Sequence, residues 1–280
     1  MDKLLVVDGS NLLFQMFYGM PARIVGKHGK PIHGTLGFVG ALIKVIKKIQ
    51  PTHAVVLFDG ESQNERKKID EEYKANRPDY SLLPEEETPF CQLPDIYAAL
   101  DYLKIKHTET TDCETDDLVA GYARVYGKKT EVTVLSFDSD FFQLIGEQVR
   151  VLRYRGEQSV LCDSAYVKNR YGVAPAQYAD WKALVGDTAD NIQGVRGIGP
   201  KTAASLLLEF GDLDELLKNT ERIAKKAARE AILSSLDRIE KNRALIALNG
   251  CACLPFSLEE LTYSYAGERT GEVLTAIEIK

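Results

Sequence analysis

The chain of 280 residues carries 35 Lys and Arg against 41 Asp and Glu, which gives a net charge of −6 and a pI near 5.4. Domains that only bind nucleic acid usually have a basic balance, so the composition argues against that class. An apolar fraction of 45% with 27% charged residues is typical of a globular protein and excludes a disordered chain or a coiled coil. No apolar run approaches the ~20 residues of a membrane span, and the start MDKLLVVDG lacks the features of a signal peptide. We therefore expect a cytoplasmic protein, with no membrane contact, made of one large domain or two modest ones.

Three short apolar runs, at residues 4–7, 54–58 and 132–137, have a continuous rather than an alternating pattern. Such runs are typical of strands that are buried on both faces of a parallel sheet. Helical periodicity lies between them, as in residues 38–49, which end before Pro51. Strands that alternate with helices predict a doubly wound α/β fold, in which ligands bind outside the carboxyl ends of the strands. At that end each run is followed by an aspartate: Asp8, Asp59 and Asp138.

Further acidic residues gather in three short stretches. ETDD (114–117) opens a predicted helix, where the helix dipole tolerates negative charge, and SFDSD (136–140) lies just past a strand. GDTADN (186–191) places two aspartates at i, i+3 spacing, which predicts one face of a helix. Any one of these residues is more simply a turn former or helix cap than a ligand. Together they give nine candidates: Asp8, Asp59, Glu114, Asp116, Asp117, Asp138, Asp140, Asp187 and Asp190.

Nine carboxylates at one sheet edge repel one another unless protons or cations neutralise them. Oxygen ligands without a well-placed His or Cys favour Mg²⁺ or Mn²⁺ over zinc, and the four histidines lie outside every acidic stretch. Two such ions about 3.5–4 Å apart are the usual apparatus of phosphodiester hydrolysis. No Ser-His-Asp set or GxxxxGK[ST] loop offers a rival chemistry. Taking the nine from the 41 acids leaves 32 against 35 basic residues, so the acidity is concentrated in the candidate metal site.

Two other regions carry patterns that suit a polyanion. Residues 60–94 form a long, charged connection with four prolines, which in an α/β domain is usually a lid or a binding element. Its basic and aromatic residues include Arg66, Tyr73, Lys74 and Arg77. Acidic residues are intermixed there, so a solvated helix face is the alternative. In residues 194–204 (GVRGIGPKTAA) a Gly-rich hairpin opens a helix, and its backbone N–H groups suit a phosphate.

Six stretches match a known family in order. They are VVDGSN (6–11), VLFDG (56–60), EYKANRP (72–78), ETDDLVAG (114–121), LSFDSDFFQL (135–144) and LVGDTADNIQGVRGIGPKTAASLL (184–207). The sequence resembles the 5′-nuclease family, which includes the 5′→3′ exonuclease domain of bacterial DNA polymerase I, phage 5′-exonucleases and flap endonucleases. The resemblance spans roughly residues 4–248 and suggests a stand-alone member without a polymerase domain. It implies a PIN-like, doubly wound α/β fold with a helical arch insertion and a C-terminal helix-hairpin-helix subdomain.

The resemblance implies two metal sites that hold two Mg²⁺ or Mn²⁺ ions. The first site would use Asp8, Asp59, Glu114 and Asp116, with Asp138 close enough to help. The second would use Asp140, Asp187 and Asp190, with Asp117 as a supporting acid. We expect the catalytic residues to be Lys74, Asp116, Asp138 and Asp187.

The family also suggests DNA contacts. In the arch, Lys74 would reach the scissile phosphate, Arg66 and Arg77 would contact other phosphates, and Tyr73 would stack on a base. The hairpin would grip duplex DNA and hold a potassium ion. Its contact residues would be Gly194, Val195, Gly197, Gly199, Lys201 and Thr202. Gln15 departs from the family, whose members often have an arginine there that contacts phosphate near the metals.

From these observations we expect a nuclease core over residues 1–175, with the arch at 60–94, a helical DNA-binding region over 176–250, and an extension of unknown role over 251–280. The expected function is structure-specific cleavage of DNA 5′ flaps and 5′ ends. One alternative is an RNase that removes RNA primers from RNA–DNA hybrids, and another is a non-catalytic binder of branched DNA. We expect a monomer whose pathway partners are a separate polymerase and ligase. Five cysteines without a CxxC pair predict reduced thiols.

Overall fold

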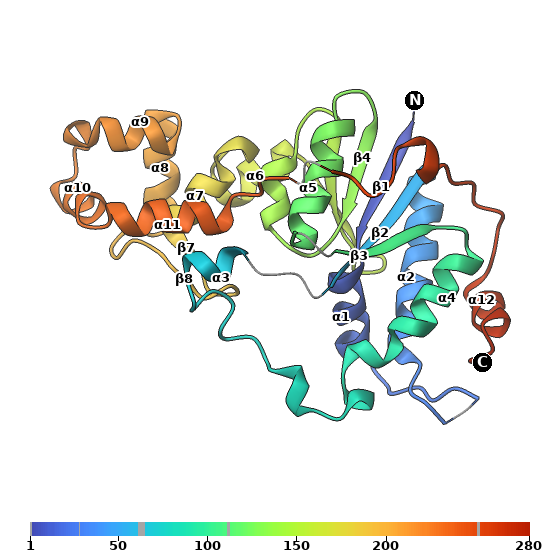
Figure 1. Ribbon diagram of the computed structural model, residues 1–280. Helices are drawn as coiled ribbons and strands as arrows, with labels where there is room; N and C mark the ends of the chain where they lie inside the picture. Colours follow the sequence, from blue (N-terminus) through green and yellow to red (C-terminus); the bar gives the residue numbers. More distant parts are fainter. Residues whose placement is uncertain (1, 28, 61–64, 111–112, 251–252) are drawn as a thin grey trace.

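The computed structural model describes residues 2–27, 29–60, 65–110, 113–250 and 253–280. Its centre is a six-stranded sheet in the order β3-β2-β1-β4-β5-β6 (Figure 1). All neighbouring strands are parallel except β6, which runs antiparallel to β5 at one edge. The predicted parallel sheet is therefore confirmed. The strands are β1 (Lys3–Asp8), β2 (His53–Asp59), β3 (Lys106–Thr110), β4 (Glu131–Leu135), β5 (Val149–Arg153) and β6 (Val160–Cys162).

Helices cover both faces of the sheet because its central strands are apolar on both sides. On one face α5 (Thr115–Tyr126) packs against β1, β2 and β4. On the other face α1 (Gly9–Gly19), α2 (His33–Ile49) and α4 (Leu93–Tyr102) share a core with β1 and β2. The chain leaves α2 through Gln50 in a left-handed conformation, directly before Pro51, so the predicted end of this helix is confirmed.

The connection at residues 60–94 is less helical than expected of an arch. Its described residues, 60 and 65–94, contain one five-residue helix, α3 (Glu65–Ile69), and three short 3₁₀ turns at Tyr80–Leu82, Glu85–Glu87 and Pro89–Gln92. Prolines break its helical pattern because they lack an N–H donor and restrict the residue before them. In Figure 1, α3 lies beside β7 and β8, and the chain then runs from α3 to α4.

The helical region includes a small hairpin. Strands β7 (Gly186–Asp187) and β8 (Ile192–Gln193) form this hairpin. The helices of the region are α6 (Ser164–Tyr171), α7 (Tyr178–Val185), α8 (Pro200–Phe210), α9 (Leu213–Lys218), α10 (Lys226–Leu233) and α11 (Leu236–Ile246). Its apolar residues belong to the same core as the α5 face of the sheet, as Val134, Tyr178 and Leu207 illustrate. The two regions therefore share a core, and the boundary at residue 175 stays a prediction.

The last part of the chain returns to the sheet. The N–H of Tyr263 donates to the carbonyl oxygen of Thr52 at 2.8 Å, and α12 (Thr270–Ala276) lies beside α2 (Figure 1). None of the helices in the described part of the chain has the length and apolar character needed to span a bilayer.

The cysteines depart from the expectation of reduced thiols at one position. Cys113 is disulfide-bonded, so the prediction is wrong there. Three others are free: Cys91, Cys162 and Cys253. The fifth, Cys251, lies outside the described residues.

Candidate metal centre

The first acidic cluster lies at the carboxyl edge of the sheet, where β1 passes directly into α1. Its members are Asp8, Asp59, Glu114, Asp116 and Asp138. Asp8 caps that helix by accepting a hydrogen bond from the N–H of Asn11 at 3.0 Å, and it accepts a second from Ser136 Oγ at 2.8 Å. Only 5% of the surface of Asp8 is exposed. Burial, reinforced by the charge of Asp59, raises the pKa of Asp8 to about 7.

Asp116 stands in the first turn of α5 and faces the same edge. Burial and the negative charge of Asp138 raise its pKa well above its usual range. Asp8 and Asp59 add to this effect, whereas Lys74 opposes it. The four carboxylates therefore interact across the ends of β1, β2 and β4, as the strand pattern predicts. A divalent cation would relieve this repulsion, which fits the predicted first metal site.

Glu114 precedes α5 and is held by two cations. Arg66 forms an ion pair with it, and the ammonium group of Lys74 lies 3.5 Å from Glu114 Oε2. Glu114 Oε1 is buried without a hydrogen-bond partner among the described residues. A buried carboxylate oxygen that lacks a partner is costly, and a metal ion would satisfy it.

Asp117 differs from its predicted place as support for the second metal. It lies beside Glu114 and is bound to Arg66 at 3.0 Å, while its Oδ1 accepts the N–H of Asn249 at 2.8 Å. The charge of Asp117 is thus used in an ion pair with Arg66 that stabilises the start of α5.

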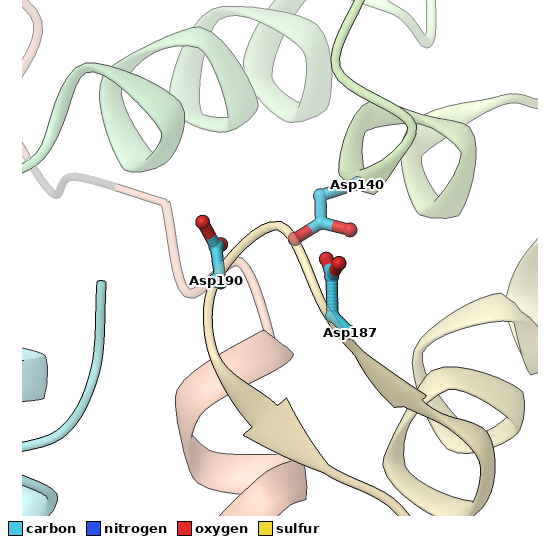
Figure 2. Close-up of side chains that lie close together, drawn as sticks. All are labelled: Asp140, Asp187 and Asp190. Atoms are coloured by element: carbon cyan, nitrogen blue, oxygen red, sulfur yellow. The ribbon is translucent and has the colours of Figure 1, made fainter. Parts of the chain in front are cut away.

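The second acidic cluster consists of Asp140, Asp187 and Asp190, which bring one ligand oxygen each to within 4.8 Å of one another (Figure 2). It is the one group this close among the described residues. Asp140 opens a 3₁₀ turn after β4, Asp187 ends β7, and Asp190 lies in the turn between β7 and β8. The predicted helical face is wrong here, because a hairpin turn and not a helix brings Asp187 and Asp190 together.

Sequence reasoning missed a lysine within this second cluster. Lys182, on α7, is 4% exposed and forms ion pairs with both Asp140 and Asp187. Although burial lowers the pKa of a lysine, the charges of Asp140 and Asp187 raise that of Lys182 above its usual range. Its position five residues before Asp187 was a weak signal, because an i, i+5 pair does not share a helix face.

The two carboxylates that pair with Lys182 have pKa values shifted in opposite directions. Burial raises the pKa of Asp140 to about 7 against the influence of Lys182. Burial also acts to raise the pKa of Asp187, but Lys182 and hydrogen bonds hold it below its usual range. Asp140, Asp187 and Asp190 form an oxygen-only donor set, two of whose members pair with Lys182, and such a set fits a hard cation.

The segment at residues 60–94 connects the two clusters through Lys74. The Lys74 side chain contacts Glu114 of the first cluster, and its backbone N–H donates to the carbonyl oxygen of Asp190 at 3.0 Å. The backbone of Lys74 has a φ of 58°, a conformation that non-glycine residues seldom adopt. Arg77 also joins the second cluster, through a 2.8 Å ion pair with Asp190.

Two DNA contacts expected in this segment, at Tyr73 and Arg66, stay predictions, and both side chains are buried in this conformation. Tyr73 is 3% exposed and packs in the main core, so its ring has no free face for a base. Arg66 is 6% exposed, and besides its two carboxylates it donates to the carbonyl oxygens of Leu245 at 2.8 Å and Ala247 at 3.1 Å. Arg66 therefore joins α3 to α5 and to the end of α11.

The Gly-rich hairpin has a buried and an exposed side. Val195 is buried and its N–H donates to the carbonyl oxygen of Leu184 at 2.8 Å, so this N–H is used within the protein, and the predicted phosphate contact of Val195 stays a prediction. A side chain at Gly194 would meet the carbonyl oxygen of Val185 at 2.1 Å, which explains that glycine by packing. The other predicted contacts lie around the start of α8, whose first N–H groups lack partners within the helix. Gly197, Gly199 and Lys201 are exposed and Thr202 is half-buried.

Comparisons with known proteins agree with this arrangement. Residues 3–172 match the model of the 5′-3′ exonuclease N-terminal resolvase-like domain, and residues 173–268 match the 5′-3′ exonuclease C-terminal SAM fold. The 5′-3′ exonuclease of Bacillus subtilis is 32% identical over 287 residues, which cover 100% of this chain and 94% of the relative. DNA polymerase I of Rhizobium leguminosarum is 35% identical over 268 residues, or 93% of this chain and 26% of the polymerase. The chain thus spans about a quarter of the length of that polymerase.

Solved structures show the same fold. The T5 5′-exonuclease, solved with bound zinc ions, has a TM-score of 0.72 at 24% identity, covering 88% of this chain and 89% of that one. The catalytic core of Rad2, solved with a DNA substrate, has a TM-score of 0.59 at 17% identity, covering 99% of this chain and 92% of that one.

The fold and the acidic centre define a resolvase-like α/β domain followed by a SAM-fold helical domain, in agreement with the predicted fold class. The chain belongs to the 5′-3′ exonuclease family. The resemblance inferred from the sequence motifs is therefore confirmed.

Proposed function

We propose that this chain is a metal-dependent, structure-specific 5′ nuclease that removes nucleotides from DNA 5′ ends and cuts 5′ flaps. One observation carries the proposal. Lys74 contacts the first acidic cluster through its ammonium group and the second through its backbone N–H. A positively charged residue is thereby joined to both acidic clusters, whose carboxylates are of the kind that hold metal ions for phosphodiester hydrolysis. Family membership supports the same reaction class.

In this proposal the first cluster holds one Mg²⁺ or Mn²⁺ ion and the second cluster holds another. Two bound ions would lower the pKa of a water molecule and stabilise negative charge on the phosphate and the leaving oxygen. The chain's own residues position these groups. Asp8 is fixed by Asn11 and Ser136, and Asp190 by its ion pair with Arg77.

The substrate grip would come from two places. Lys74 would leave Glu114 to bind the scissile phosphate, since a phosphate oxygen is a comparable partner for an ammonium group. The exposed N–H groups at the start of α8 would bind a phosphate of the duplex, with Lys201 beside them and a potassium ion as a further contact. We further propose that the protein acts in the cytoplasm as a monomer, on DNA that a polymerase and a ligase also process.

The test uses a 5′-labelled flap duplex with Mg²⁺ or Mn²⁺. We expect cleavage by the wild type, its loss in EDTA, and a loss of at least a hundredfold in rate for Asp116→Asn and Asp187→Asn. Asp101→Asn is the matched control, because Asp101 is exposed on α4. A wild type that leaves every flap, nick and 5′ end intact while still binding the DNA in Ca²⁺ would contradict the proposal and favour a non-catalytic binder. A strong preference for substrates with a 5′ RNA segment would instead favour primer removal.

A further inference from the structure

Two arginines beside the acidic centre differ from the other cations there in their ion pairing. Near the two clusters, Arg66, Lys74, Arg77 and Lys182 are all engaged in ion pairs with carboxylates. Arg153, at the end of β5, and Arg155, just past it, have no carboxylate partner among the described residues.

These arginines are held by an aromatic ring at the carboxyl edge of the sheet. The Arg153 guanidinium carbon lies 4.8 Å from the centre of the Phe137 ring, and that of Arg155 lies 5.1 Å from it. Arg153 also donates from a terminal nitrogen to the carbonyl oxygen of Phe137 at 3.1 Å, while its Nε is buried and has no hydrogen-bond partner in the part of the chain that the structure describes. A ring face orients a guanidinium group and leaves its N–H edges free for an anion.

Phe137 stands within the acidic centre. Its neighbours in sequence are Ser136, which donates to Asp8, and Asp138, whose N–H donates to Ser136 Oγ at 3.0 Å. The N–H of Phe137 itself donates to Asn11 Oδ1 at 2.9 Å. The ring that holds the two guanidinium groups is thus anchored between residues of the first cluster.

The backbone that carries Arg155 is held in place from two sides. Gln15, on α1, donates from Nε2 to the carbonyl oxygen of Tyr154 at 2.6 Å. The N–H of Arg155 donates to Ser159 Oγ at 2.9 Å. Gln15 therefore supports this loop, and Arg153 and Arg155 carry positive charge on this side of the centre.

We propose that Arg155, supported by Arg153 and Phe137, binds a backbone phosphate of the cleaved DNA strand next to the scissile phosphate. The acidic centre repels a polyanion, and an unpaired, exposed guanidinium group at its border supplies local attraction. Arg153 is the more enclosed of the two and orients the ring, so it is a positioning residue. This inference rests on the proposed nuclease function and adds a contact on the α1 side of the centre.

The test measures binding of a 5′-flap duplex in Ca²⁺ as a function of salt. For Arg155→Gln we expect affinity to fall roughly 10- to 150-fold, as for a lost hydrogen bond to a charged group. The slope of log K against log salt should become shallower by about 0.9, the value for one phosphate contact. Arg155→Lys should restore the slope, because it keeps the charge, but not all of the affinity, because it lacks the planar fork. Arg150→Gln is the matched control, since Arg150 lies on β5 and donates to the backbone carbonyl oxygens of Gly146, Glu147 and Val149.

A second measurement identifies the phosphate. Neutral methylphosphonates are placed one at a time along the cleaved strand. One position beside the scissile phosphate should weaken wild-type binding by the same factor as Arg155→Gln and should have no further effect on that variant. Equal salt slopes for wild type and Arg155→Gln, or additive losses at every position, would overturn the proposal. A wild type that binds in this manner but never cleaves would refute the nuclease function and leave the Arg155 contact standing.

Discussion

Lys182 offers the sharpest test of how the negative charge of the second acidic cluster is neutralised without metal. Lys182→Met keeps the length of the side chain and removes its charge. In the metal-free protein the variant leaves Asp140 and Asp187 buried without the cation that both contact. Removing one partner of a buried ion pair costs about 3–5 kcal/mol of the free energy of unfolding. We expect a loss toward the lower end of this range at pH 8, because removing Lys182 raises the pKa of Asp140 further and protonation then relieves part of the cost.

A divalent ion should reverse much of this loss. An ion present at 100 times its dissociation constant stabilises a folded protein by about 2.7 kcal/mol. In the wild type the ion shares its carboxylates with the Lys182 ammonium group, whereas in the variant it does not. We therefore expect Mg²⁺ to stabilise Lys182→Met more than the wild type, by about 1.4 kcal/mol for each tenfold gain in affinity.

The assay is urea unfolding in EDTA and in Mg²⁺, followed by the fluorescence of Trp181, the only tryptophan and the direct neighbour of Lys182. Lys218→Met is the control: it breaks an exposed 3.0 Å pair with Glu215, whose loss costs at most about 1 kcal/mol. The reasoning is refuted if Lys182→Met is as stable as the wild type in EDTA, or if Mg²⁺ stabilises both proteins equally.

Three further outcomes follow from the structure. Because the folded-state pKa of Asp8 is raised to about 7, the native state binds more protons than the unfolded state between pH 4 and pH 7. The free energy of unfolding of the metal-free protein should therefore fall by about 4 kcal/mol as the pH rises from 4 to 7, and it should stay level with saturating Mg²⁺. Urea titrations at each pH measure both. Arg66→Met should lose about 3–5 kcal/mol, and Arg66→Lys should recover little because it cannot bind several acceptors in one plane; a thermal midpoint near that of the wild type would contradict this. Tyr73→Leu, which removes the aromatic ring, should bind flap DNA within twofold of the wild type, because the ring is buried; a tenfold loss in a gel shift for the folded variant would support a base-stacking role.

The sequence alone was sufficient to predict the parallel sheet and to bring most of the first acidic cluster together. Continuous apolar runs indicate parallel strands, and parallel strands place their carboxyl ends at one edge. Asp8, Asp59 and Asp138 therefore had to come together wherever the helices packed. The start of α5 was equally local, because acidic residues are favoured in the first turn of a helix. The family motifs then gave the order of the two domains.

Only the tertiary structure decided which charges are free and which are used. Arg66 is a basic residue in a charged segment, yet it bonds to Leu245, 179 residues away, and no local pattern encodes that contact. Lys182 sits in a helix like any other lysine, and its burial depends on the hairpin that brings Asp187 back toward Asp140. Strand and helix patterns follow from neighbouring residues, whereas the burial of a polar side chain depends on which distant elements pack over it. That difference separates the acidic centre, which was predictable, from the lysine and arginines that surround it.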